Sequence, residues 1–154
     1  MGDKTRKIGG FIIMIEMNDV YKTYPNGVIA VNGINVKIKK GEFVYVVGPS
    51  GAGKSTFIKM MYREEKPTKG TITVNGINLA SLRNSKVPVF RRNIGVVFQD
   101  FKLLPSLTVY ENVAFALEVI EVEPKEIQKR VMDVLDLVGL KHKARMLPNE
   151  LSGG

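Results

Sequence analysis

The chain has 154 residues, 44% of them hydrophobic and 25% charged, which is ordinary for a globular protein with one core and room for a small subdomain. It contains no cysteine, which excludes disulfides and thiolate metal sites. The formal net charge of +8 fits a nucleic-acid partner, a face toward acidic lipids or a basic surface that aids solubility. We expect no nucleic-acid partner, because no stretch interleaves aromatic residues with clustered Lys and Arg.

The first residues, MGDKTRKIGGFIIMIEM, place Lys and Arg before an apolar run, as a secretion signal does. The run from Phe11 to Ile15 is too short for such a signal, and Glu16 follows it directly. No run of about 18 apolar residues occurs, so we expect no transmembrane segment and a cytoplasmic protein. Residues 1–13 form an extension of uncertain origin, since Met14 is an alternative start.

Residues 14–42 are expected to form short strands, because turn-forming residues interrupt a strand-like pattern. Asn-Gly pairs suit tight turns, since both residues tolerate positive φ. The predicted turns are Pro25-Asn26-Gly27, Asn32-Gly33 and Lys40-Gly41. Between the last two turns, Ile34, Val36 and Ile38 alternate with polar residues, which is typical of a half-buried antiparallel strand.

The pattern then changes to a continuous apolar run, Phe43–Val47, which predicts a strand covered on both faces. A glycine-rich loop follows, and then a helix from about residue 54 to 63. The segment KGTITVNGINL, residues 69–79, predicts a hairpin, and Pro88 suits the first turn of a short helix. A second apolar strand is expected over Ile94–Phe98.

The rest of the chain has helical character. Thr108, followed three residues later by Glu111, forms a capping box that predicts a helix start. Pro124 opens a second helix that stops at Gly139, and its expected apolar stripe consists of Ile127, Val131, Val134, Leu135 and Val138. His142 is the only histidine, and we expect it to be a solvent-exposed helix residue. Antiparallel strands, buried strands and a late helical pair together predict one α/β unit with a helical annex.

The sequence GPSGAGKST fits the pattern G-x-x-x-x-G-K-[ST] of a phosphate-binding loop, between a predicted buried strand and a predicted helix. Its glycines let the backbone approach a ligand, and the amides of residues 51–56 converge at the positive end of the helix. We expect Lys54 to bridge the β- and γ-phosphates of a nucleoside triphosphate, and the Ser55 hydroxyl to bind magnesium. The predicted binding residues are Gly48, Pro49, Ser50, Gly51, Ala52, Gly53, Lys54, Ser55 and Thr56.

Gln99 ends the second apolar strand, at a position where parallel-sheet folds place ligand contacts. Its side-chain amide could coordinate magnesium or orient a water. Glutamine is also a common surface residue, so the residues alone leave both interpretations open.

Three motifs in order resemble the P-loop, Q-loop and signature motif of ATP-binding cassette (ABC) ATPases: GPSGAGKST, VVFQD at Val96–Asp100 and LSGG at Leu151–Gly154. The resemblance covers residues 14–154 and implies an α/β P-loop NTPase fold with an antiparallel β-subdomain and a helical subdomain. Within the family, VPVFRRNIGVVFQDFKLLPSLTVYENVAFALEVI and VGLKHKARMLPNELSGG are most similar to the FtsE subfamily, which acts with the membrane protein FtsX in bacterial cell division. ATPases that export lipoproteins or antimicrobial peptides share FQ and LLP, and they stay as an alternative.

The resemblance implies ATP and Mg2+ as cofactors and assigns roles to further residues. Tyr24 matches the aromatic residue that stacks on adenine, although a hairpin-edge aromatic is its plain structural alternative. Gln99 matches the residue that binds magnesium and contacts the attacking water. The signature residues Ser152, Gly153 and Gly154 act in trans, on the nucleotide held by the other subunit of a homodimer.

The resemblance also implies a membrane partner. The stretch Phe101–Glu111 is expected to receive the coupling helix of an FtsX-like integral membrane protein, which places the ATPase at the inner face of the cell membrane. Its apolar residues Phe101, Leu103, Leu104 and Leu107 fit a partner-facing patch or, nearly as well, a helix-packing core.

The family pattern continues after LSGG with a strand that ends in Asp-Glu and with a switch histidine. We therefore expect residues 1–154 to be the N-terminal portion of a longer ATPase, to bind ATP–Mg and not to turn it over. The expected organisation is an extension at 1–13, a nucleotide-binding core at 14–100, a helical subdomain at 101–150 and the start of the signature motif at 151–154. The resemblance also places a further strand beside Phe43–Val47, whose edge is unpaired without it.

Two other classes stay open: a different P-loop enzyme, such as a kinase or GTPase, and a non-enzymatic basic binding module. The chain has no guanine-specific Asn-Lys-x-Asp pattern, which argues against a GTPase. The basic module predicts steeply salt-dependent nucleic-acid binding that survives Lys54→Ala.

Overall fold

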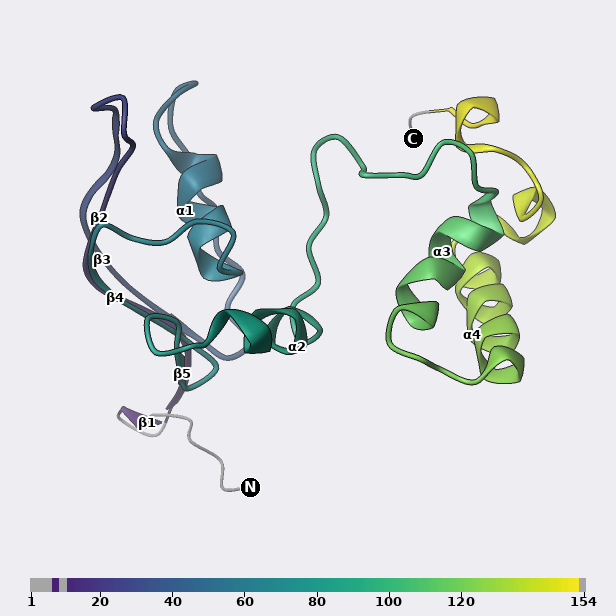
Figure 1. The fold of residues 1–154 in the computed structure, drawn as a ribbon, viewed down its shortest axis with the longest axis horizontal. Coiled ribbons are helices and arrows are strands. Elements are labelled where there is room, and N and C mark those ends of the chain that lie inside the picture. Colours follow the sequence, from purple (N-terminus) through teal and green to yellow (C-terminus); the bar gives the residue numbers. More distant parts are fainter. Residues whose placement is uncertain (1–6, 9–10, 153–154) are drawn as a thin grey trace. The chain divides into compact units, whose positions relative to one another are not determined.

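The structure, a computed structural model, describes residues 7–8 and 11–152 of the chain, with side chains from residue 14 onward. The chain divides into two compact units, Met1–Gly95 and Val96–Gly154. The first unit contains the described strands, and the second is helical (Figure 1). Among the described residues, no helix has the length and apolarity needed to cross a membrane.

The first unit is built on an antiparallel sheet in which β2 is the central strand. β3 pairs with one edge of β2 and β4 with the other, while β5 extends the sheet beyond β4 and β1 pairs with the start of β2. The strands are β1 (Lys7–Ile8), β2 (Phe11–Thr23), β3 (Ile29–Lys39), β4 (Lys69–Val74) and β5 (Ile77–Asn78). The predicted turn at Pro25-Asn26-Gly27 and the predicted hairpin over residues 69–79 are confirmed.

Helix α1 (Lys54–Met61) packs its apolar side against this sheet (Figure 1). Phe57 and Met60 of the helix are buried among the sheet residues Met17, Val20, Val31, Ile72 and Val74. Burial of such side chains stabilises a fold by about 1.5–3 kcal/mol each. The short helix α2 (Val87–Arg91), which follows the 3-10 turn Asn84–Lys86 and carries Pro88 in its first turn as predicted, adds Phe90 to the same core.

The predicted turn at Asn32-Gly33 is wrong, because both residues lie inside β3. The register of β3 against β2 shifts here: Ile34 faces Val20, but Val31 faces Lys22, so β3 carries one extra residue. Gly33 takes a φ of 66°, which suits a bulge. The Asn-Gly pair therefore bends a strand instead of ending it.

The two predicted apolar strands are also wrong: Phe43–Val47 and Ile94–Phe98 form no strand. A strand exists only through hydrogen bonds to a neighbouring strand. Among the described residues, the strands that pair are β1 with β2, β2 with β3 and β4, and β4 with β5. Phe43 and Val47 are 81% and 86% exposed, and Val97 is 96% exposed. The apolar runs mark side chains suited to burial, but no described strand pairs with them.

The second unit is a pair of helices, α3 (Val109–Glu118) and α4 (Pro124–Leu137), followed by 3-10 turns at Lys141–Lys143 and Pro148–Glu150. Its core consists of Val109, Ala114, Ile127, Val131, Leu135 and Ala144. The predicted stripe on α4 is confirmed for Ile127, Val131 and Leu135, whereas Val134 and Val138 are exposed. Gly139 ends the helix with a φ of 72°, as predicted, while the amide of Leu140 donates to the carbonyl of Leu135 at 2.7 Å.

The predicted capping box at the start of α3 is confirmed. The Glu111 amide donates to Thr108 Oγ1 at 3.3 Å, and the Thr108 amide donates to Glu111 Oε2 at 2.7 Å. Thr108→Ala removes the side-chain acceptor, so we expect thermal unfolding to report a loss of about 1 kcal/mol of stability. No loss would mean that the amides at this helix start are satisfied without the cap.

The same capping box should make stability depend on pH. The hydrogen bonds from the Thr108 backbone amide and hydroxyl lower the pKa of the Glu111 carboxyl below its ordinary value of 4.5. Because the folded pKa is depressed, the stabilisation is present above pH 4.5 and is lost as the pH falls through the folded pKa. Glu111→Gln should reduce this acid sensitivity in unfolding curves measured from pH 6 to 3, whereas Glu118→Gln on the same helix should leave it unchanged. Equal acid sensitivity in both variants would contradict this role.

Candidate functional site

The glycine-rich loop ahead of α1 is shaped by two left-handed glycines. Gly51 has a φ of 78°, and Gly53, the N-cap of α1, has a φ of 82°. A Cβ added to Gly53 would lie 1.9 Å from the backbone carbonyl oxygen of Ala30 in β3. The start of the helix thus rests directly on the β3 backbone, and only glycine fits at this contact.

The first turn of α1 leaves backbone amides available for a ligand. A helix leaves its first amides without intrahelical partners, and here the first helical bond runs from Phe57 to the Gly53 carbonyl at 2.8 Å. None of the hydrogen bonds found among the described residues uses the amides of residues 53–56 as donors. Such amides at the positive end of a helix form an arrangement suited to a phosphate group.

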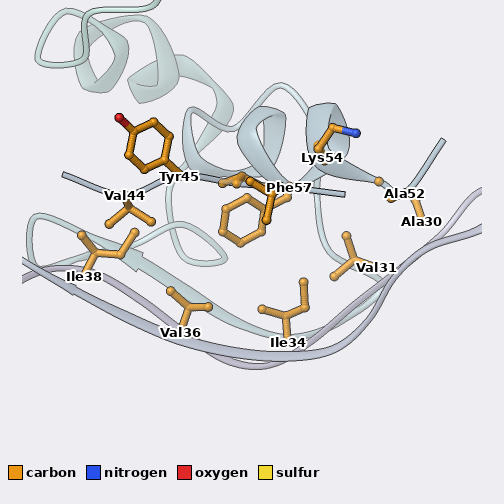
Figure 2. A pocket seen from close by; sticks show the side chains of 13 residues that line it. Ala30, Val31, Ile34, Val36, Ile38, Val44, Tyr45, Ala52, Lys54 and Phe57 are labelled. Atoms are coloured by element: carbon orange, nitrogen blue, oxygen red, sulfur yellow. The ribbon is translucent and has the colours of Figure 1, made fainter. Parts of the chain in front are cut away.

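Lys54 is held at this loop by its own backbone. Its ammonium donates to the carbonyl oxygens of Gly48 at 2.7 Å and Pro49 at 2.6 Å. Figure 2 shows the Lys54 nitrogen directed away from the apolar side chains of Ile34 and Val36. A single cation therefore lies next to the free amides, in a segment from residue 48 to 56 that carries no acidic residue.

Tyr24, the predicted adenine-stacking residue, lies against the same helix turn. Its hydroxyl is 3.1 Å from Thr56 Oγ1, and the Thr56 side chain is buried. The backbone of Tyr24 is fixed as well, because its amide donates to the Val28 carbonyl and its carbonyl accepts from the Gly27 amide, both at 2.9 Å. The Tyr24 ring and the start of α1 thus lie together in the first unit.

An apolar cavity of about 370 Å³ borders the glycine-rich loop at residues 52–54 (Figure 2). It lies between β3 and the extended segment that follows it, and it reaches the first turn of α1. The lining residues are Ala30, Val31, Ile34, Val36, Ile38, Val44, Tyr45, Val46, Val47, Ala52, Gly53, Lys54 and Phe57. Most of its walls are aliphatic and aromatic side chains, which are unsuited to a charged phosphate, and its rim reaches the helix start at Gly53 and Lys54.

The remaining predicted site residues belong to the second unit. Gln99 is exposed in a turn, and Ser152 is exposed near the end of the described chain. Gly153 and Gly154 lie outside the described residues. The roles of Gln99 and Ser152 toward a nucleotide stay predictions.

The segment predicted to face a membrane partner is also in the second unit. Phe101, Leu103 and Leu104 are exposed, and Leu107 is half-buried. The alternative of a helix-packing core therefore does not hold for the first three of these side chains. His142 is exposed in a 3-10 turn, which confirms its predicted exposure.

The residues near the loop fit magnesium only in part. Ser55 is exposed and carries a hydroxyl oxygen, a ligand type that Mg2+ accepts together with phosphate oxygens and waters. The described part of the chain holds no cluster of three His, Cys, Asp or Glu able to bind a metal by itself. A magnesium ion at Ser55 would thus need ligands from the bound phosphates.

Three contacts of this site were missed in the sequence: the Ala30 carbonyl under Gly53, the Thr56 hydroxyl at Tyr24, and Lys22 beside Tyr24. The first two join segments distant along the chain, and no local pattern signals them. Lys22 had a signal, since it lies only two residues before Tyr24 in the sequence.

Comparison with known proteins identifies the family. The profile of the ABC transporter family matches residues 31–154. Over 141 residues, 92% of this chain, the sequence is 71% identical to the cell division ATP-binding protein FtsE of Bacillus subtilis and 60% identical to that of Streptococcus pneumoniae D39. The methionine import ATP-binding protein MetN of Helicobacter hepaticus is 45% identical over the same share of this chain, which covers 40% of that protein.

Solved structures agree with the sequence matches. A dimer of the ATP-binding cassette MJ0796 in a post-hydrolysis state, bound to ADP and Pi, superimposes with a TM-score of 0.82 and 37% identity, over 91% of this chain and 64% of that chain. The chain spans about three fifths of the length of the FtsE proteins it matches, 62% and 61% of the two named above.

Proposed function

The chain belongs to the ABC transporter family, and from that premise we propose that its P-loop and Tyr24 form the ATP site of an FtsE-type ATP-binding subunit. The fold is accordingly that of the N-terminal portion of an ABC ATPase cassette, a P-loop NTPase with an antiparallel β-subdomain and a helical subdomain. The observation that carries the proposal is the meeting of four features in the first unit: free helix-start amides, Lys54, the exposed Ser55 hydroxyl and the Tyr24 ring.

In this proposal each part of ATP has its own contacts. The amides of residues 51–56 at the positive end of the helix and the Lys54 ammonium hold the phosphates, since both donate hydrogen bonds and the ammonium adds a positive charge. For this the Ala52 amide gives up its hydrogen bond to the Pro49 carbonyl. The Ser55 hydroxyl binds the magnesium that accompanies them, and Gln99 completes the metal and water contacts. The adenine stacks on Tyr24, and Ser152, Gly153 and Gly154 serve the nucleotide of a second subunit in a homodimer.

We assign nucleotide binding to residues 1–154 and propose ATP hydrolysis for the whole protein. Magnesium would supply charge compensation for the transferred phosphoryl group. The MJ0796 cassette is described as bound to ADP and Pi after hydrolysis, which supports ATP hydrolysis, and as dimeric, which supports the homodimer.

The proposed physiological role is that of FtsE: action with an FtsX-like integral membrane protein in cell division, at the inner face of the membrane. The identity of 71% to an FtsE supports it against 45% for a MetN, the import ATPase that is the second candidate. Exposed Phe101, Leu103 and Leu104 fit a surface that a membrane partner covers. Co-purification with an FtsX-type membrane protein, lost when these three residues are replaced by serine, separates this role from the MetN type.

The adenine contact has a direct test. Tyr24→Ala should weaken ATP binding by roughly 1–3 kcal/mol, the value of one stacked base, and leave the affinity for inorganic triphosphate unchanged. Tyr24→Phe keeps the ring and loses only the hydrogen bond to Thr56, so its effect should be smaller. Isothermal titration calorimetry with both ligands measures this, with Tyr45→Ala, an exposed tyrosine in the same unit, as the control. Equal losses for ATP and triphosphate in Tyr24→Ala would show that the ring does not contact the base.

A further inference from the structure

A lysine covers one face of the Tyr24 ring. The Lys22 ammonium lies over the ring, 5.0 Å from its centroid. It is fixed there by two acceptors, the Glu65 carboxylate at 2.7 Å and the Lys66 carbonyl oxygen at 2.9 Å. The side chains of Lys22 and Glu65 are only 13% and 27% exposed, so this ion pair is largely shielded from water.

The chain geometry explains this arrangement. Lys22 is in the last residues of β2 and Tyr24 follows two positions later, just past the end of the strand, which brings the ammonium over the ring. Glu65 lies in the turn after α1, and its carboxylate reaches the end of β2. The turn after the phosphate-binding helix is thereby tied to the residue that positions the aromatic ring.

Three restraints therefore act on Tyr24. Its backbone is held by the turn, its hydroxyl contacts Thr56, and one ring face is occupied by the Lys22 ammonium. A flat base can stack only on a ring face that is free. The negative face of an aromatic ring attracts a cation, so Lys22 stabilises this ring position as well as blocking one side.

We propose that Lys22 is a positioning residue for nucleotide binding: held by Glu65, it fixes the Tyr24 ring from one face, so that the base of ATP stacks on the opposite face. This inference rests on the proposed function, since it assumes that Tyr24 contacts the base. Ordering the ring before the ligand arrives reduces the entropy lost on binding. Because its ammonium already has two fixed acceptors, Lys22 acts through Tyr24 and does not hold the phosphates.

If Lys22 positions the Tyr24 ring, its variants should change the affinity for ATP, which has a base, but not for inorganic triphosphate, which has none. Lys22→Met keeps the length of the side chain and removes the charge, so ATP should bind roughly two- to fivefold more weakly, while inorganic triphosphate binds unchanged. Glu65→Gln releases the ammonium and should shift ATP affinity in the same direction. Lys22→Arg keeps a cation over the ring and a partner for Glu65, and should retain the ATP affinity of the unmodified chain.

The experiment is isothermal titration calorimetry of the whole 154-residue chain with ATP–Mg and with inorganic triphosphate. Lys37→Met is the matched control, because Lys37 is also ion-paired to a glutamate of the sheet, Glu16, at 3.1 Å. Weaker ATP binding with unchanged triphosphate binding in Lys22→Met and Glu65→Gln, and normal binding in Lys22→Arg and Lys37→Met, is the expected result.

Two results would overturn the inference. If Tyr24→Ala loses ATP affinity but Lys22→Met and Glu65→Gln do not, the lysine does not position the ring. If Lys22→Met weakens ATP and triphosphate equally, Lys22 acts on the phosphates or on the fold. If the unmodified chain binds no ATP, the proposed function itself fails, which is a distinguishable outcome.

Discussion

Lys54→Ala should weaken ATP binding by roughly 1.5–3 kcal/mol, the value of hydrogen bonds to a charged group, or about 10- to 150-fold in affinity. Lys54 is the cation next to the free amides of α1, and its ammonium is held at the loop by the Gly48 and Pro49 carbonyls. A bound phosphate is a stronger acceptor for this ammonium than a neutral carbonyl, so the contact gains on binding. Inorganic triphosphate should lose affinity as much as ATP does, in contrast to the Tyr24 variants.

Calorimetry with both ligands measures this loss. The matched control is Lys59→Ala, which removes another lysine of the same helix, one whose ammonium is paired with Glu64 at 2.8 Å. The control should bind ATP with unchanged affinity. Equal affinities of Lys54→Ala and the unmodified chain would remove the lysine from the phosphate site.

Gly53→Ala should lower the free energy of unfolding by about 2–5 kcal/mol. The methyl group would meet the Ala30 carbonyl oxygen at 1.9 Å, so either β3 or the helix start must shift, which typically costs about 1–3 kcal/mol. A left-handed φ of 82° adds about 1–2 kcal/mol for a residue with a Cβ. Since native proteins are stable by about 5–15 kcal/mol, this variant should be close to unfolding.

Gly51 supplies the matched control for Gly53. It lies in the same loop with a similar φ of 78°, but a Cβ there meets nothing within 4 Å. Gly51→Ala should therefore show only the backbone term, about 1–2 kcal/mol, in urea unfolding. If both variants lose the same stability, the contact between Gly53 and β3 is not tight in solution.

The elements that the sequence predicted well have local causes. The capping box of Thr108 and Glu111, the stop at Gly139 and the helix after the glycine-rich loop each depend on residues within one or two turns. Such signals act through nearby backbone groups, and they hold whatever the rest of the chain does. The glycine-rich loop also has a local conformation, with positive φ at Gly51 and Gly53, whereas its binding of phosphate stays a prediction.

The failures have distant causes. Phe43–Val47 has the composition of a buried strand, but a strand also needs a neighbouring edge, which composition cannot supply. Asn32-Gly33 has the composition of a turn. The residues before and after it pair with β2, so it stays inside β3 as a bulge. The link between Tyr24 and Thr56 spans 32 residues, so its existence depends on how the hairpin and α1 pack.

Binding of the ATP phosphates by the backbone amides of residues 51–56 underlies every prediction made for this site. The most direct measurement is a titration of the isotope-labelled chain with ATP–Mg, followed through its amide nuclear magnetic resonance signals. We expect the signals of residues 51–56 to shift most and to saturate together, and to stay in place in Lys54→Ala at the same ATP concentration. Saturable shifts confined to other basic segments, with the signals of residues 51–56 unmoved, would contradict it.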